Sequence, residues 1–295
     1  MKQKHVVDKG ALEKIMFAAS SILFVPGSRS DRISKALASA ADLVCIDLED
    51  AVAAPDKDSA RETVMSGLAG WDRTRVAVRI NGVMTRAGLK DLIALTQCDA
   101  PPPLLFVPMV EHASEIAQVA RVLDNPAIGL VPLIETVKGL REAHLIAAHR
   151  QVAAMMFGGG DFSAQLGVDL AFDPLLVARG QFIMACADAG VPAIDVPFVK
   201  LDDAQGLADE CRKVRALGFA AKAAIHPAQV EAINTGFGAD AAAIAEANEA
   251  IAAYEAAGGM AIRHNGKMLE APIVARMRAM LARENRANER NLEDA

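Results

Sequence analysis

The chain has 295 residues, 53% hydrophobic and only 4% aromatic, with a formal net charge of −6 at pH 7. The acidic balance argues against nucleic acid as a partner, and no apolar run approaches the roughly 20 residues that a membrane-spanning helix needs. The N-terminus lacks an apolar core of signal-peptide length, and the four cysteines are scattered without zinc spacing. We therefore expect one main domain in a reducing, cytoplasmic setting.

Short apolar runs recur along the chain, and a helical pattern follows each of them. After an N-terminal helical extension at 1–20, the predicted strands cover 21–25, 43–48, 75–80, 104–108, 130–134, 153–157, 193–196 and 220–225. Helices are predicted at about 30–41, 57–69, 87–95, 113–123, 174–189 and 203–217, and between the fifth and sixth strands. Eight βα units predict an α/β fold, a parallel TIM-type (β/α)8 barrel over residues 1–235. The alternative is an open doubly wound sheet, which the absence of G-x-G-x-x-G after the first strand disfavours.

Residues 236–295 do not continue the barrel repeat. An Ala-rich helix at 239–257 is followed by a short hairpin at 260–270, in which Asn265-Gly266 forms the turn. A second helix at 272–286 precedes a tail that we expect to be disordered. The region is predicted to form a C-terminal helical and hairpin arm, or lid.

Two of the predicted strands end in a carboxylate. Glu135 follows the fifth strand and Asp161 the sixth, so one βα unit places both at the same edge of the sheet. Two carboxylates in a dry site repel each other, and a hard cation such as Mg²⁺ relieves that repulsion. Gly159 and Gly160 let the backbone approach a ligand and offer N–H groups to an anion. The alternative is that the two carboxylates are unrelated and each caps the following helix.

Other charged residues gather where the predicted strands end, which is the active-site rim of such a barrel. Arg79 alternates inward from the third strand, and its planar fork suits a substrate carboxylate. The alternative partners of Arg79 are Asp47, Glu49 or Asp50. Asp47 and Glu49 share one strand face and are candidates for residues that orient the ligands of a metal without binding it themselves. Asp50 is predicted to face the other way.

Four further residues receive weaker predictions. Arg29 and Arg32 follow the first strand, where they either bind substrate phosphates or begin a solvated helix. His226 is more typical of a satisfied histidine at the start of a loop than of a general base. Lys222 is the candidate for the amine of a Schiff-base aldolase, because it lies within a predicted strand.

Seven motifs occur in order between about residues 21 and 272: FVPGSRSDR, CIDLEDAVAAPDKDSAR, VRIN, PLIET-x-x-G, FGGGDFSAQLG, AAIHPAQV and GKMLEAP. The series resembles the citrate lyase beta-subunit family of the HpcH/HpaI aldolase superfamily, which includes malyl-CoA and citramalyl-CoA lyases. The resemblance implies a TIM barrel, Mg²⁺ bound by Glu135 and Asp161, and Arg79 on the carboxylate of a 2-oxo acid.

The resemblance also implies a lyase that cleaves or forms a 3-hydroxy-acyl-CoA, with an acyl-CoA and a 2-oxo acid as products. Many relatives have an aspartate in place of Glu270, in a lid that often reaches a neighbouring subunit and acts in proton transfer at the acyl-CoA. Glu270 is therefore a candidate for that role, in a homo-oligomer (a trimer or hexamer). The alternatives are a citrate lyase beta subunit that uses an acyl-carrier-protein thioester, a malyl-CoA thioesterase, and a non-catalytic relative that binds CoA or oxo acid.

Overall fold

The computed structural model describes residues 19–238 and 241–293, and the chain divides into two units, Met1–Phe237 and Gly238–Ala295. In the first unit, eight parallel strands close into a barrel, because β1 pairs with β8. They are β1 (Ser21–Pro26), β2 (Leu43–Asp47), β3 (Val76–Arg79), β4 (Leu104–Val107), β5 (Gly129–Ile134), β6 (Met155–Phe157), β7 (Ala193–Asp195) and β8 (Ala221–Ala224). The predicted barrel is confirmed, and the open sheet is wrong. Of the predicted helical extension at 1–20, residues 1–18 lie outside the described residues, and residues 19–20 are not helical.

Side chains alternate between the barrel interior and the outer face of the strands, as the two-residue period of a strand requires. The interior is apolar and is formed by Ile22, Leu43, Cys45, Ala77, Leu104, Phe106, Val131, Leu133, Ala154, Met156, Ile194, Ala221 and Ala223. Phe24 packs against this cluster and meets Phe106 edge to face. The interior is thus a filled core, with polar groups gathering only where the strands end.

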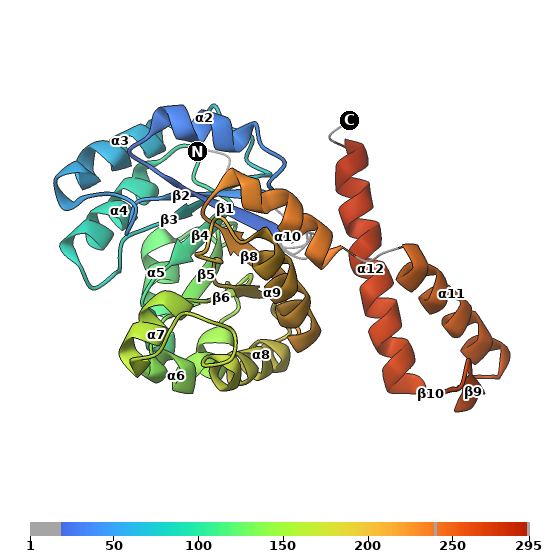
Figure 1. Cartoon of the computed structure of the whole chain (residues 1–295). Coiled ribbons are helices and arrows are strands. Elements are labelled where there is room, and N and C mark those ends of the chain that lie inside the picture. The colour runs from blue at the N-terminus through green and yellow to red at the C-terminus, as the bar shows by residue number, and fades with distance from the viewer. Residues whose placement is uncertain (1–18, 239–240, 294–295) are drawn as a thin grey trace. The chain divides into compact units, whose positions relative to one another are not determined.

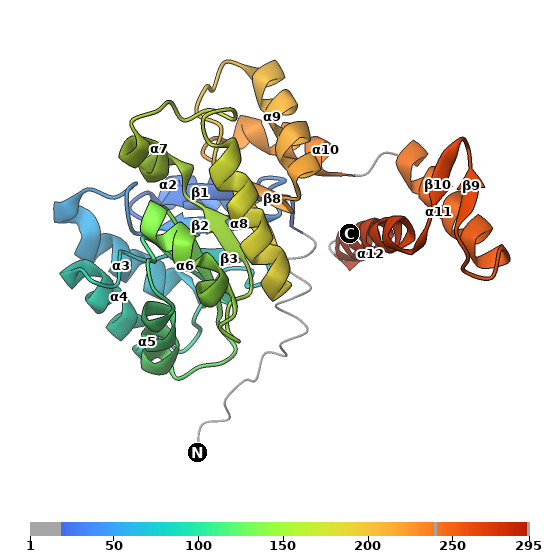
Figure 2. The same cartoon turned by 90° about the horizontal axis from the view of Figure 1, so that it is seen from below.

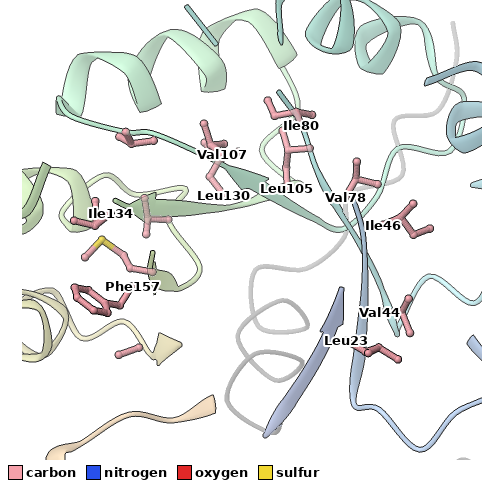
Figure 3. Close-up of a cluster of buried hydrophobic side chains, with 14 of the residues drawn as sticks. Leu23, Val44, Ile46, Val78, Ile80, Leu105, Val107, Leu130, Ile134 and Phe157 are labelled. Carbon is pink, nitrogen blue, oxygen red and sulfur yellow. The ribbon is translucent and has the colours of Figure 1, made fainter. Parts of the chain in front are cut away.

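Helices surround the barrel (Figures 1 and 2). The outward side chains of the strands form one apolar cluster with side chains of these helices. Figure 3 shows part of this layer, with Val44 and Val78 on the neighbouring strands β2 and β3. The helices are α2 (Ser30–Leu37), α3 (Lys57–Gly67), α4 (Arg86–Gln97), α5 (Ala113–Leu123), α6 (Val137–Ala147), α7 (Gly159–Leu166), α8 (Leu176–Ala189), α9 (Ala204–Leu217) and α10 (Val230–Phe237), with short 3-10 turns η1 (Ala54–Asp56) and η2 (Pro227–Gln229). Of these, α7 and α10 are absent from the sequence prediction.

The second unit contains α11 (Ala241–Ala256), the hairpin strands β9 (Ile262–His264) and β10 (Lys267–Leu269), and α12 (Ala271–Glu293). Asn265 and Gly266 have positive φ values of 47° and 78° and form the predicted two-residue turn. The predicted helix end at 286 is wrong, since α12 continues to Glu293 through helix-favouring Glu, Arg and Leu residues. The predicted disordered tail is helical as far as 293, and residues 294–295 lie outside the described residues. The lid role of this unit stays a prediction. No helix among the described residues combines the length and apolarity needed to cross a membrane.

Candidate active site

Three of the predicted site residues continue the inward alternation of their strands. Asp47 ends β2, Arg79 ends β3, and Glu135 directly follows β5. Each lies two residues beyond a side chain of the barrel interior, so all three are directed to the inside of the barrel at the carboxyl ends of the strands. This is the rim at which barrels of this type carry their active sites.

Arg79 is bound by carboxylates of the chain itself. Its Nε and Nη2 donate to the two oxygens of Asp47 at 2.7 and 2.6 Å. Its Nη1 lies 2.9 Å from Glu49 Oε2 and 3.6 Å from Asp50 Oδ2. Burial disfavours the charge of Arg79, but the hydrogen bonds and negative charge of Asp47, with the charge of Glu49, outweigh burial and raise its pKa. Of the predicted alternatives, pairing with these carboxylates is present in the structure, and binding of a substrate by Arg79 stays a prediction.

The chain turns sharply after β2. Asp47 accepts hydrogen bonds from the backbone N–H groups of Glu49 at 2.9 Å and Ala51 at 3.0 Å, as in turns built on an Asp side chain. The turn brings Asp50 back toward Arg79. The prediction that Asp50 faces away is therefore wrong, because strand alternation ends at Asp47.

Glu49 carries a buried oxygen without a hydrogen bond. Its Oε2 contacts Arg79 Nη1, but the geometry is not that of a hydrogen bond, and the atom has no other partner among the described residues. Burial raises the pKa of Glu49 to about 8; the charge of Arg79 opposes this rise, and the charges of Glu135 and Asp50 add to it. The charge of Arg79 therefore offsets the burial of Glu49 only in part, and added positive charge nearby would favour the ionised carboxylate.

Glu135 is only 5% exposed and is enclosed by backbone. Its Oε2 accepts a 2.6 Å hydrogen bond from the Met109 N–H. On the other side, a Cβ on Gly158 would lie 2.0 Å from Glu135 Cγ, so only glycine leaves room for this side chain. Burial raises the pKa of Glu135 to about 7; the Met109 hydrogen bond and Arg79 oppose the rise, and the charge of Asp161 adds to it.

Met109 is a site residue that the sequence analysis missed. It has a left-handed backbone, with φ of 56°, which is uncommon for a residue with a side chain. The conformation occurs in the segment between β4 and α5, and the Met109 N–H is the group that binds Glu135. The amino-acid type carries no signal of this role, because the contact uses backbone and links two strand ends.

Asp161 lies in the first turn of α7 and is exposed. Its charge raises the pKa of Glu135, so the two carboxylates are within electrostatic reach. Gly159 is buried, whereas a Cβ on Gly160 would find no described atom within 4 Å. The glycine run therefore forms a helix start beside Glu135 rather than a free loop.

Other predicted residues have local partners. Arg29 donates through Nε and Nη2 to Asp31, both at 3.0 Å, and Arg32 is exposed on α2. His226 Nδ1 accepts from the Ala228 N–H at 3.2 Å, as expected for a satisfied histidine. Glu270 is exposed between β10 and α12 of the second unit. The predicted roles of Arg29 and Arg32 on phosphates, and of Glu270 in proton transfer, stay predictions.

Lys222 lies on the wrong face of its strand for a Schiff base. Its neighbours Ala221 and Ala223 belong to the barrel interior, so Lys222 is directed outward toward the helices. Its Nζ donates to Asp195 at 2.6 Å and to Glu210 of α9 at 2.7 Å. The Schiff-base alternative is therefore wrong.

The carboxylates at this rim fit a hard divalent cation. One oxygen of Glu135 accepts a hydrogen bond from the Met109 N–H. The carboxylate of Asp161 lies within electrostatic reach of Glu135. Asp47, Glu49 and Asp50 surround the guanidinium of Arg79 with carboxylates. Mg²⁺ needs only one or two protein carboxylates, because water and substrate oxygens complete its shell. Within the described ranges, no three or more His, Cys, Asp or Glu side chains form a group that could hold a metal ion.

A family model described as HpcH/HpaI aldolase/citrate lyase matches residues 20–227, which is most of the chain. The chain belongs to this family. The resemblance stated from the motifs is thereby confirmed, and the match covers the barrel strands from β1 to β8.

Relatives within the HpcH/HpaI family carry two kinds of activity in their names. The (3S)-malyl-CoA thioesterase of Cereibacter sphaeroides is 35% identical over 272 residues, covering 89% of this chain and 93% of the relative. The L-malyl-CoA/beta-methylmalyl-CoA lyase of the same organism is 31% identical and covers 80% and 84%. The structure of CitE from Mycobacterium tuberculosis with magnesium, acetoacetate and coenzyme A has a TM-score of 0.80 and 30% identity, covering 91% and 99%. Members of the family are thus lyases or related thioesterases, and magnesium is bound within the family.

Proposed function

We propose that the chain is a Mg²⁺-dependent carbon–carbon lyase that cleaves, or forms, a 3-hydroxy-acyl-CoA such as malyl-CoA or citramalyl-CoA. The observation that carries the proposal is the enclosure of Glu135 between the Met109 N–H and Gly158, with the charge of Asp161 beside it. A carboxylate so buried is stabilised as an anion by a cation, and we assign Glu135 and Asp161 as the Mg²⁺ ligands. The names of relatives that act on malyl-CoA support the substrate class.

Asp47 binds one edge of the Arg79 guanidinium, and we place the substrate carboxylate at another. Of the five N–H groups of a guanidinium, two are bound by Asp47 through Nε and Nη2. The substrate carboxylate is therefore expected at the Nη1–Nη2 edge, where it displaces Glu49 from Nη1. Because Glu49 Oε2 makes no hydrogen bond, its displacement breaks the ion pair with Arg79 without breaking a hydrogen bond.

In the cleavage direction the substrate hydroxyl loses its proton and becomes the oxo group. The adjacent carbon–carbon bond breaks, and its electron pair passes to the acyl-CoA as an enolate, which takes up a proton. Mg²⁺, when bound, supplies positive charge against the negative charge that develops on the substrate oxygen. Arg79 orients the carboxylate of the 2-oxo acid, and we assign Glu270 the proton transfer at the acyl-CoA carbon.

A thioesterase is the second candidate, because the relative at 35% identity bears that name. In that reaction water attacks the thioester carbonyl and releases free CoA thiol and a 3-hydroxy acid. The carbon–carbon bond stays intact, so no oxo acid forms. The products therefore separate the two functions without ambiguity.

The test is a product assay on the purified chain with malyl-CoA, citramalyl-CoA and citryl-CoA, in Mg²⁺ or in EDTA. Oxo acid without thiol supports the lyase, and thiol without oxo acid supports the thioesterase. Neither product would contradict both and favour a carrier-protein-dependent subunit or a non-catalytic relative. Glu135→Gln is expected to abolish the Mg²⁺-dependent product with the fold retained, and unchanged activity would contradict the metal assignment.

A further inference from the structure

Four charged side chains form a cluster on the outer face of the barrel, between strands β7 and β8 and helices α8 and α9. Lys222 is fully buried and donates through Nζ to Asp195 at 2.6 Å, to Glu210 at 2.7 Å and to the Val196 carbonyl at 2.7 Å. Arg179 of α8 donates through Nε to the other oxygen of Asp195 at 2.8 Å. We call Arg179, Asp195, Glu210 and Lys222 the outer charge cluster; its two cations and two carboxylates balance.

A buried ion cluster is weak evidence of stabilisation, since apolar side chains often fill such a place equally well. The outer charge cluster does, however, hold two loops. Lys222 binds the loop after β7 through the Val196 carbonyl. Arg179 donates through Nη1 to the carbonyls of Ala171 at 3.2 Å and Phe172 at 3.4 Å, in the loop between α7 and α8.

Both loops pack on the helix start that carries Asp161. A Cβ on Gly159 would lie 3.1 Å from Val196 Cγ1 and 3.2 Å from Leu170 Cδ1. Arg179 also lies 5.7 Å from the centre of the Phe157 ring, at the end of β6. Val196 therefore connects the outer charge cluster to the helix start: Lys222 binds its carbonyl, and its side chain occupies the space where a Cβ on Gly159 would lie.

We propose that the outer charge cluster, and Lys222 in particular, positions the turn at residues 159–161 and so holds Asp161 toward the rim of the barrel. Lys222 is a positioning residue, since it faces away from the barrel interior and acts through Val196. The consequence for metal binding rests on the proposed function, in which Asp161 is a ligand. The positioning of the turn itself does not depend on that assignment.

Lys222→Met removes the bond to the Val196 carbonyl and leaves Asp195 paired with Arg179. The matched control is Arg75→Met, at the residue before β3. Arg75 donates to the carbonyls of Leu37, Ser39 and Ala41 at 3.3, 2.7 and 2.7 Å, at the end of the barrel away from the rim. Both variants lose a cation that binds backbone carbonyls, but only Lys222 is connected to Gly159.

The first measurement is amide hydrogen exchange, compared after correction for any change in global stability. In Lys222→Met, amides at 158–163 are expected to exchange about 10-fold faster than in the wild type, with no such change in Arg75→Met. Equal exchange in Lys222→Met and wild type, or the same increase in Arg75→Met, overturns the proposal. If Lys222→Met does not fold, Val196→Ala decides instead, since it removes the side chain that touches Gly159 and leaves the cluster intact. Unchanged exchange at 158–163 in Val196→Ala overturns the proposal, and faster exchange there supports it.

The second measurement is Mn²⁺ binding, followed by electron paramagnetic resonance of the free ion. The Kd for Mn²⁺ in Lys222→Met is expected to be about 10-fold higher than in Arg75→Met. Losses of about this size follow when residues that orient metal ligands are removed. If the wild type binds Mn²⁺ and both variants bind it equally, the positioning role is wrong and the metal site stands. If the wild type binds no Mn²⁺, the metal assignment is wrong, and the exchange measurement alone decides the positioning.

Discussion

Two backbone positions shape the place that Glu135 occupies. The Met109 N–H binds one oxygen at 2.6 Å, and Gly158 presents no Cβ to the Glu135 Cγ. Both contacts need an uncommon local condition: a left-handed backbone at Met109 and a glycine at 158. Strain and special residues of this kind are most often retained where they orient a functional group.

Gly158→Ala is expected to lower kcat/KM about 100-fold, because the new Cβ would lie 2.0 Å from Glu135 Cγ and would displace the carboxylate. Gly160→Ala is the matched comparison, since its Cβ would find no described atom within 4 Å and the N–H is kept. The loss in Gly160→Ala is expected to be far smaller. Steady-state kinetics of the two variants measure this, and equal losses would contradict the fit at Gly158.

Glu49→Gln tests the raised pKa of Glu49. A carboxyl whose pKa is about 8 in the folded protein and about 4.5 when unfolded contributes fully to stability below pH 4.5. This contribution is lost as the pH rises through 8, at about 1.4 kcal/mol per pKa unit at most. The unfolding free energy of the metal-free protein is therefore expected to fall more between pH 5 and pH 8 in the wild type than in Glu49→Gln. Urea denaturation at both pH values measures the difference, and parallel curves would refute the raised pKa.

At the scale of elements, the strands were predictable because each is a short apolar run bounded by polar residues or by glycine and proline. The helix α7 was not, because it begins at Gly159 and Gly160, and glycine disfavours helix in isolation. Burial of Phe162 against the core holds that helix in place. Tertiary packing thus overrides the local preference at the point where the site needs a helix start.

The candidate site was predictable to a similar extent. Arg79 and Glu135 follow from the ends of their strands, because parallel strands bring their carboxyl ends to one rim. The turn that brings Asp50 to Arg79 and the Met109 contact with Glu135 were not predictable. They depend on backbone geometry beyond the strand ends and on contacts between segments distant in the sequence.

Gly88 of α4 shows how closely a helix approaches the loop after β3. A Cβ on Gly88 would lie 2.2 Å from the Gly82 carbonyl oxygen and 2.6 Å from that of Asn81. Gly88→Ala is therefore expected to lower the unfolding free energy by about 1–3 kcal/mol. Gly180→Ala in α8 is the control: its Cβ would find no described atom within 4 Å, so better helix propensity should raise stability by about 0.5–1 kcal/mol. Urea denaturation measures both changes in unfolding free energy, and unchanged or higher stability in Gly88→Ala would contradict the close approach of α4.

At the scale of the whole molecule, the two units differ in the cores that they build. The barrel has an apolar interior and an apolar outer layer. The second unit packs around Ala250, Leu269 and Val274, while Met260 and Met268 are 70% and 63% exposed. Because small units bury a smaller share of their surface, we expect this unit to gain stability from contacts outside itself.

Contacts between subunits of the predicted homo-oligomer would meet that expectation, and the mass of the protein in solution tests for them. Sedimentation equilibrium of the full chain is expected to give the mass of a trimer or a hexamer of the 31.1 kDa protomer. A monomer at micromolar concentration would refute the prediction.

A shortened variant that ends at Phe237 tests whether metal binding and turnover need different parts of the chain. It is expected to stay folded, because the barrel closes through β1 and β8 within the first unit. Its Mn²⁺ affinity is expected to match that of the full chain, since Glu135 and Asp161 are both retained. Turnover is expected to fall at least about 100-fold, because Glu270 is lost.

Glu270→Gln in the full chain is the matched variant, since it keeps the second unit and removes only the ionisable group. An equal loss of turnover in Glu270→Gln and in the shortened chain would assign the proton transfer to this side chain. A loss confined to the shortened chain would mean that turnover needs the second unit for a reason other than the ionisable group of Glu270. Full turnover in the shortened chain would remove residues 238–295 from the mechanism and direct the search for the proton donor to the carboxyls of the barrel rim, among which burial raises the pKa of Glu49 to about 8.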